Sequence, residues 1–258
     1  MSDGDVMSGQ SREQKVSTAF VSMTDALMSE YDVIDLLSTL LHSSAEVLGM
    51  EAGGILLADP TGDLELVAST SEEAEIVETI IVAAGEGPCI ECFETAAHVA
   101  ITDIDTVADK WPKFHSSAKE QGFRSTFAVP MMLRDQVMGV MNLLSSQVHE
   151  VSEADGRIAQ ALADLAVLGI LHERNFRSPY LVDEQLHLAL DTRVLIEQAK
   201  GVLAQREDLT MTEAFDALRN YAHAEGTTLR RVAKETVLRT LTTEAIMAAH
   251  TETASTHS

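Results

Sequence analysis

Cationic side chains gather near the end of this chain at spacings that could bind phosphate. Arg230, Arg231 and Lys234 lie at positions i, i+1 and i+4, which share one side of a helix. Residues 184–243 hold eight Lys or Arg against nine Asp or Glu, whereas the whole chain holds 18 against 41 and has a net charge of −23. The overall charge therefore argues against a protein that coats nucleic acid or membranes, and only the C-terminal part could tolerate a polyanion.

Lys200 and Gly201 stand side by side inside a helix-forming run. Apolar residues recur with a helical period on both sides of them, at Leu188, Leu195 and Val202. A glycine inside a helix costs about 1 kcal/mol relative to alanine, so a close helix contact or a close ligand favours it here. In one interpretation Lys200 neutralises a phosphate beside Gly201. In the other it is a solvated lysine next to a glycine that allows tight helix packing.

Cys89 and Cys92 form a single CxxC sequence. Zinc would need two further ligands, and His98 and His115 lie at no recognised spacing. Two other interpretations remain, a redox-sensing dithiol and small apolar residues that fill a helix. No nucleophile and base lie at a useful spacing, so we expect no catalytic residues, no metal site and no enzyme.

An α+β domain should position the first part of these residues, because short strand-like runs alternate with helical ones. Helices are predicted over 32–48, 72–82, 114–121 and 153–175, and strands over 54–58, 64–69, 99–101, 125–133 and 136–145. The first two and the last two strands should form antiparallel hairpins. We expect a sheet with one face covered by helices.

The N-terminal segment combines a polar start with an apolar stripe. Residues 1–10 are rich in Gly and Ser and are expected to be disordered. Val16, Phe20, Met23 and Leu27 then follow a helical spacing with a narrow apolar face. This helix packs either on its own domain or on a second copy of the chain, as a dimerisation helix.

Three further helices are predicted after a boundary at 176–183, which contains Pro179. The first covers 184–206, the second follows a capping box at Thr210 and Glu213, and the third starts near Thr228. The tail, 244–258, should be frayed or disordered. The longest apolar run, 158–171, is too short to span a bilayer and no signal peptide is visible, so we expect a cytoplasmic protein.

The C-terminal helices resemble an ANTAR domain, the three-helix RNA-binding module of bacterial antitermination regulators. The resemblance covers about 184–241 and depends on Arg193, Ile196, Ala199-Lys200-Gly201, Leu203, Ala214-Phe215, Leu218-Arg219, Ala222 and Ala233. It implies binding to paired stem-loops in nascent leader transcripts, as a homodimer, with no enzymatic activity. The expected RNA-binding residues are Arg193, Ala199, Lys200, Gly201, Arg219, Arg230, Arg231 and Lys234.

The preceding part, about 30–172, resembles a GAF domain, a small-molecule sensor fold. The matching sequences are Gly85-Glu86-Gly87-Pro88-Cys89, Val99 to Asp103, Trp111-Pro112-Lys113-Phe114, Arg124 to Pro130 and Gly139 to Leu143. A GAF fold does not name its ligand. The Asn-Lys-Phe-Asp-Glu signature of cyclic-nucleotide-binding members is absent, so the identity of a small-molecule signal stays open and no cofactor is assigned.

Together these features predict an α+β GAF-like antiparallel sheet with flanking helices, followed by an all-α three-helix ANTAR module. We expect five segments. They are a disordered start with the N-terminal dimerisation helix (1–29), the GAF sensor domain (30–175), a linker (176–183), the ANTAR RNA-binding domain (184–243) and a tail (244–258). A signal would shift the helices flanking Pro179 and so present or hide the basic surfaces of two modules. Two alternatives remain, a DNA-binding regulator that uses the helices from Thr212 and Thr228, and a sensory or dimerisation protein without nucleic acid.

Overall fold

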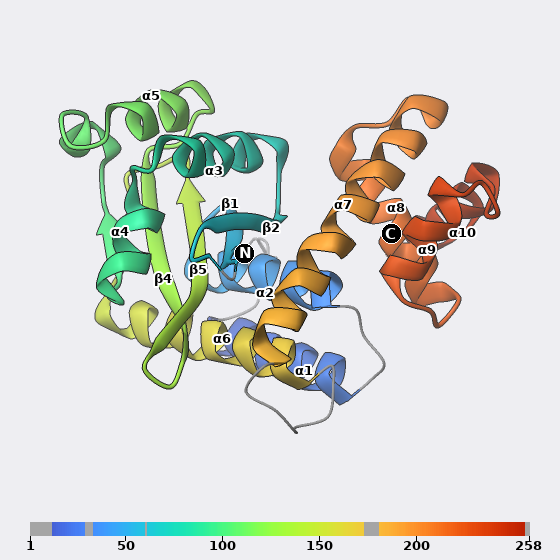
Figure 1. Ribbon diagram of the computed structural model, residues 1–258, viewed down its shortest axis with the longest axis horizontal. Helices are drawn as coiled ribbons and strands as arrows, with labels where there is room; N and C mark the ends of the chain where they lie inside the picture. Colours follow the sequence, from blue (N-terminus) through green and yellow to red (C-terminus); the bar gives the residue numbers. More distant parts are fainter. Residues whose placement is uncertain (1–11, 29–32, 60, 173–180, 256–258) are drawn as a thin grey trace, which may run out of the picture.

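The protein consists of an N-terminal domain built on a sheet and a C-terminal group of helices (Figure 1). The computed structural model describes residues 12–28, 33–59, 61–172 and 181–255. The predictions for residues 1–10 and for the segment around Pro179 lie outside these residues. None of the helices in the described part of the chain has the length and apolar character that crossing a bilayer requires.

A five-stranded antiparallel sheet, in the order β2-β1-β5-β4-β3, forms the N-terminal domain. The strands are β1 (Ala52–Ala58), β2 (Leu64–Ser69), β3 (Val99–Ile101), β4 (Ser125–Leu133) and β5 (Gln136–Ser145). The predicted hairpins β1–β2 and β4–β5 are confirmed. Because β5 lies between β1 and β4, the two hairpins join into one continuous sheet.

Helices cover both faces of this sheet, so the prediction of one covered face was wrong. The helices of the domain are α2 (Val33–Leu48), α3 (Glu72–Ala84), α4 (Pro88–Thr95), the 3-10 turn η1 (Ile104–Val107), α5 (Pro112–Glu120) and α6 (Glu153–His172). Ile55 and Leu57 of β1 pack with α2 and α6, whereas Leu56 between them packs with α3, α4 and α5. The continuous apolar run of β1 reflects burial on both sides.

Capping residues define both ends of α3, the helix that contributes to the site. Ser71 caps α3, because its side chain accepts a hydrogen bond from the backbone N–H of Ala74, and Gly85 ends the helix with a φ of 64°. Three glutamates, Glu72, Glu73 and Glu75, occupy the first turn of α3, where the helix dipole favours negative charge.

Helix α1 (Arg12–Met28) packs on its own domain. Ala19 is buried against Val47 of α2 and Leu162 of α6, and Val16 and Phe20 pack partly against the same cluster. The side chains of the other two residues in the predicted stripe, Met23 and Leu27, lie outside the described residues. Of the two alternatives for this stripe, its described half supports packing within the chain.

The C-terminal helices follow the predicted order and add one more. They are α7 (Leu181–Glu207), α8 (Met211–Ala224), α9 (Leu229–Val237) and α10 (Thr243–Ser255). The predicted capping box is confirmed, with Thr210 and Glu213 bonded reciprocally at the start of α8. The expectation of a frayed tail was wrong for residues 244–255, because α10 packs against α8 and fully buries Ile246. Residues 256–258 lie outside the described residues.

The apolar core runs from one part of the molecule into the other. Ile34 of α2 and Val67 of β2 belong to the same buried cluster as Ile196, Ala199 and Leu203 of α7. Helix α7 extends away from the sheet toward α8 and α9 in Figure 1. The sheet domain and the C-terminal helices therefore share an interface whose centre is apolar.

Candidate nucleic-acid interface and interior of the sheet domain

The residues expected to bind RNA fall on three helices. Helix α7 carries Arg193, Ala199, Lys200 and Gly201, helix α8 carries Arg219, and helix α9 carries Arg230, Arg231 and Lys234. The structure divides their charged members into two sets. We call Arg230, Arg231 and Lys234 the outer cations, and Arg193, Lys200 and Arg219 the docked cations.

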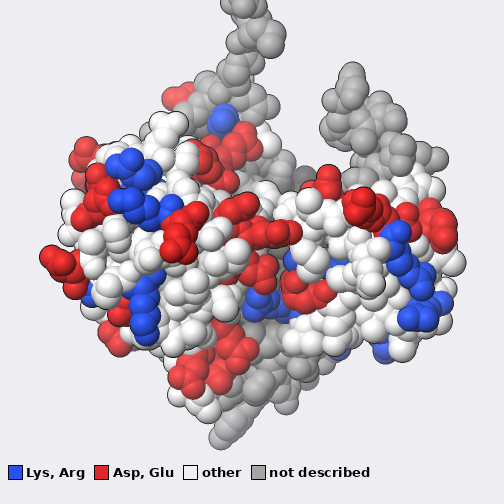
Figure 2. All heavy atoms as spheres, turned by 90° about the horizontal axis from the view of Figure 1, so that it is seen from above, with Lys and Arg blue, Asp and Glu red and all other residues white. Residues whose placement is uncertain are grey.

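The outer cations lie on the solvent side of α9, because Leu229, Val232, Ala233 and Thr236 bury the other side. Arg231 is 69% exposed and pairs with Glu235 one turn later, at 3.0 Å between Nε and Oε1. Lys234 is exposed in the last turn, where the helix dipole favours a cation. Arg230 is half-buried and takes part in an interaction. Figure 2 shows basic side chains along the outer edge of the C-terminal lobe.

Among the docked cations, Arg219 binds helix α2 of the sheet domain. Its Nε donates to Oδ1 of Asp35 at 2.7 Å, and its Nη2 donates to the Thr39 hydroxyl at 2.8 Å. His223, one turn along α8, lies 2.8 Å from the other oxygen of Asp35. Burial alone would raise the pKa of Asp35, but hydrogen bonds from His223 and the charge of Arg219 outweigh it and hold the pKa below the ordinary 3.8.

Arg193 makes the second polar contact between the two parts. Its Nη2 lies 3.2 Å from Oε1 of Glu75 on α3, and its Nη1 donates to the backbone carbonyl of Leu66 on β2. Glu197 lies four residues after Arg193 on α7, and Glu213 and Asp216 lie six and three residues before Arg219 on α8. Instead both guanidinium groups pair with carboxylates of the sheet domain.

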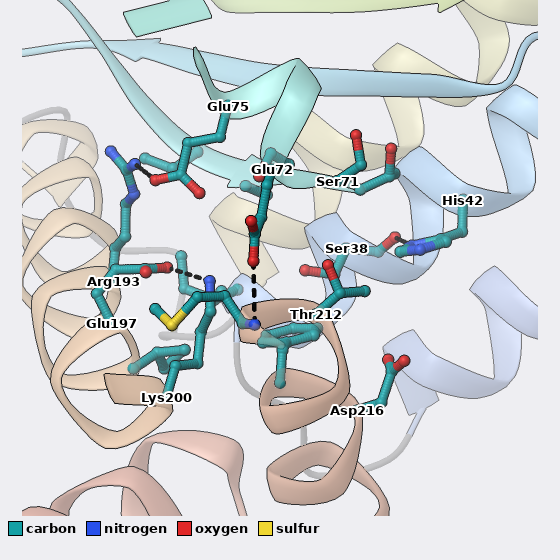
Figure 3. A pocket seen from close by; sticks show the side chains of 18 residues that line it. Ser38, His42, Ser71, Glu72, Glu75, Arg193, Glu197, Lys200, Thr212 and Asp216 are labelled. Carbon is teal, nitrogen blue, oxygen red and sulfur yellow. Dashed lines mark hydrogen bonds and ion pairs between the residues drawn. The ribbon is translucent and has the colours of Figure 1, made fainter. Parts of the chain in front are cut away.

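Lys200 lies inside this interface with only 7% of its surface exposed. Both sequence interpretations placed it at the surface, on phosphate or in solvent. Its Nζ pairs with Oε1 of Glu197 at 2.9 Å, and the two side chains face a cavity of about 40 Å³ (Figure 3). Across the cavity, Glu72 of α3 accepts a hydrogen bond from the backbone N–H of Met211, at the start of α8. The cavity has room for a water-sized group.

Gly201 faces open space, in contrast to its buried neighbours Ala199 and Lys200. A Cβ added at this position would meet nothing within 4 Å. Tight helix packing therefore does not account for this glycine in the arrangement seen here. Its exposed backbone leaves room for another molecule to approach α7 closely.

A buried polar network lies under α3, on the opposite side of that helix from solvent. Asn142 of β5 donates from Nδ2 to Oε1 of Glu78 at 2.5 Å and accepts from the Thr126 hydroxyl at 2.7 Å. The Cys89 thiol donates to the other oxygen of Glu78 at 3.2 Å. Burial raises the pKa of Glu78 from 4.5 to about 7, and the hydrogen bonds from Asn142 and Cys89 oppose this rise. Gly54 makes room for the carboxylate, since a Cβ there would lie 2.8 Å from its Cγ.

Both cysteines are fully buried free thiols. Burial raises the pKa of Cys89 well above its ordinary value, and Glu78 adds to the rise, while burial raises the pKa of Cys92 to about 12. Because the thiolate is the reactive form, this environment favours the filling role over the redox-sensing one. Within the described residues, no three His, Cys, Asp or Glu side chains gather as a metal site would need.

Both thiols of the folded protein are therefore expected to resist modification by a thiol reagent at neutral pH. Burial removes access and the raised pKa removes the nucleophile. Absorbance with an aromatic disulfide reagent should show reaction of both cysteines only after urea is added. Reaction in the folded state at the rate of an exposed peptide thiol would restore the redox interpretation.

Two family models match this chain. The model of the GAF domain matches residues 30–170, and the model of the ANTAR domain matches residues 184–237. The chain belongs to the GAF domain family and carries a C-terminal ANTAR domain. It thus joins a sensory domain to an RNA-binding antitermination domain, and both are regulatory domains.

Solved structures of similar fold are distant in sequence. The GAF domain of an Acinetobacter phosphoenolpyruvate-protein phosphotransferase is 19% identical, over 64% of this chain and 96% of that chain, with a TM-score of 0.48. The free methionine-R-sulfoxide reductase of Neisseria meningitidis, in complex with its substrate, is 17% identical over 67% and 98%, with a TM-score of 0.48. The GAF domain of the Coxiella burnetii phosphotransferase is 16% identical over 63% and 96%, with a TM-score of 0.49. No curated protein matches this chain.

The sequence did not predict the roles of four carboxylates in these contacts, namely Asp35, Glu72, Glu75 and Glu78. Glu72 and Glu75 lie in the first turn of α3, where the helix dipole favours negative charge. Their presence there therefore did not indicate that they pair with another helix. The role of Glu78 could have been predicted, because this residue lies on the apolar side of α3 next to Val77 and Ile81. A carboxylate in such a place predicts a buried polar partner.

Proposed function

We propose that this protein is a signal-responsive regulator that binds hairpin loops in nascent leader transcripts and promotes transcription antitermination. The observation that carries the proposal is the exposed basic side of α9 on the ANTAR domain of a strongly acidic chain. Arg231 and Lys234 are available there to phosphate and to unpaired bases. The exposed backbone of Gly201 offers a second place of close approach.

Replacing the two exposed outer cations with glutamine, in the variant Arg231→Gln/Lys234→Gln, should weaken RNA binding about tenfold. Removal of one cation that binds a phosphate should also reduce the slope of log K against log salt by about 0.7 to 0.9, so the slope of the double variant should be smaller by about 1.5. Fluorescence anisotropy with a labelled two-hairpin RNA, over a series of salt concentrations, measures both quantities.

The matched control is Lys113→Gln/Arg157→Gln, which removes the same charge from the GAF domain. Lys113 is exposed, and Arg157 pairs with Glu153 one turn away, much as Arg231 pairs with Glu235. The control should keep the wild-type slope. Equally weakened binding in the two double variants would mean that the charge effect is general and that α9 is not the RNA surface.

A DNA-binding function is the second candidate, because α8 and α9 are joined by a short turn and α9 carries Arg230 and Arg231 in its first turn. Such a helix can read guanines in the major groove as well as bind phosphates. The same anisotropy assay with duplex DNA separates the two candidates. Tighter binding of a specific duplex than of any two-hairpin RNA would favour the DNA-binding function.

The proposal also includes a homodimer and a small-molecule signal that binds the GAF domain. A surface cleft of about 430 Å³ at the ends of α3 and α4 could hold a small molecule. Its lining combines the apolar side chains of Leu64, Val82, Ile90 and Phe93 with the carboxylates of Asp63 and Glu94. The outer side of α1, with Val21 57% exposed, could contact a second copy of the chain. Native mass spectrometry reports a retained ligand and the mass of the assembly together. A monomer at working concentration would contradict the dimer.

A further inference from the structure

Two of the docked cations, Arg193 and Arg219, bind groups of the GAF domain that resemble what RNA would offer them. Arg219 binds a carboxylate and a hydroxyl of α2, and Arg193 binds a carboxylate of α3 and a backbone carbonyl of β2. A guanidinium group recognises phosphate with the same planar donors that it uses for carboxylate. An RNA phosphate would therefore compete with these carboxylates for the same guanidinium donors.

Lys200 is excluded from RNA by position. Only 7% of its surface is exposed, and the wall across its cavity comes from α2, β2 and α3 of the GAF domain (Figure 3). The rest of the cavity lining comes from α7 and α8 of the ANTAR domain. Access to Lys200 therefore requires the two domains to separate at this interface.

We propose that the GAF domain competes with RNA for the docked cations, with Asp35 and Glu75 acting in place of RNA phosphates, so that the docked arrangement is an RNA-off state. This inference rests on the proposed RNA-binding function and adds its regulation. The outer cations stay accessible in the docked arrangement, so weak contact with RNA remains, and full binding requires undocking.

The negative charge of the GAF domain supports this competition with RNA. Nearly all of the net charge of −23 lies outside residues 184–243. A docked GAF domain therefore repels RNA in addition to covering the cations. The apparent affinity for RNA is the intrinsic affinity reduced by the fraction of molecules that are undocked.

The test uses the full chain with both interface carboxylates neutralised, Asp35→Asn/Glu75→Gln, which leaves every residue of the ANTAR domain unchanged. Two-hairpin RNA should bind about tenfold more tightly, because the undocked fraction increases. Small-angle X-ray scattering should show a larger radius of gyration. The control is Asp109→Asn/Glu150→Gln, which removes the same charge at exposed positions that make none of the interface contacts. It should bind RNA as the wild type does.

A charge reversal, Asp35→Lys/Glu75→Lys, is the second variant, because it repels the docked cations where neutral side chains could still allow docking. If scattering shows separation and RNA affinity stays at the control value, the inference is wrong while the proposed function stands. The inference is also wrong if neither variant separates the domains or tightens binding. Absence of RNA binding by every variant, with separation shown by scattering, overturns the proposed function itself.

Discussion

Replacing Glu78 with glutamine is expected to remove a pH dependence of about 3 kcal/mol from the stability of the GAF domain. Glu78 is fully buried, and its pKa is raised from 4.5 to about 7. Below the lower value the carboxyl is protonated in the folded and in the unfolded chain. Between the two values the unfolded chain loses a proton that the folded chain keeps, so the free energy of unfolding falls as the pH rises.

Urea unfolding followed by tryptophan fluorescence measures this effect in the right domain. Trp111 is the only tryptophan of the sequence, and it is buried in the apolar cluster on the same face of the sheet as Glu78. The difference in free energy of unfolding between wild type and Glu78→Gln should shift by about 2 kcal/mol between pH 5 and pH 8, with the wild type relatively more stable at the lower pH. Subtracting the variant removes the contributions of the other carboxylates.

Glu73→Gln is the control, since Glu73 is exposed on the same helix. Its difference from the wild type should be the same at both pH values. If the Glu78→Gln difference is equally flat, the carboxyl is not protonated in the folded protein near neutral pH.

Helix α3 connects this buried network with the domain interface. Glu78 faces the sheet, whereas Glu75, one turn earlier, pairs with Arg193. Glu72 accepts a hydrogen bond from the backbone N–H of Met211, the first residue of α8. Binding of a ligand or a proton at the Glu78 network would therefore act on α3, the helix whose Glu75 pairs with the ANTAR domain. Interfaces of packed helices respond to such shifts as two-state elements.

Local chemistry made much of the fold predictable. The capping box at Thr210 and Glu213 requires only residues three apart, and the turn at Arg134 and Asp135 fixes the β4–β5 hairpin. The split of charge along the chain likewise indicated which part could meet RNA. Each of these signals is contained in a short stretch of sequence.

What escaped prediction depends on contacts between distant residues. Asp35 and Arg219 are 184 residues apart, and either side chain alone is an ordinary surface residue. The helix α10 has a weak apolar pattern of its own and is held by packing against α8. Burial of Lys200 follows from domain docking, which no local pattern encodes.

Gly139→Ala is expected to destabilise the GAF domain by about 3 kcal/mol or more, because β5 approaches β1 closely at this point. Gly139 pairs with Leu57 across the ladder. A Cβ on residue 139 would lie 2.2 Å from the backbone carbonyl oxygen of Leu56 and 2.8 Å from Cδ2 of Leu57. The side chain can rotate away, but the carbonyl can move only if the two strands separate.

Gly156→Ala is the matched substitution in the same domain, since a Cβ on residue 156 of α6 would lie 3.6 Å from Nδ1 of His98, an ordinary contact. Alanine inside a helix should leave the stability unchanged or raise it by up to about 1 kcal/mol. The free energy of unfolding of both variants follows from Trp111 fluorescence in urea. A decrease below about 1 kcal/mol for Gly139→Ala would mean that β1 and β5 can move apart at little cost, and the sheet would then be less rigid at its centre than its register indicates.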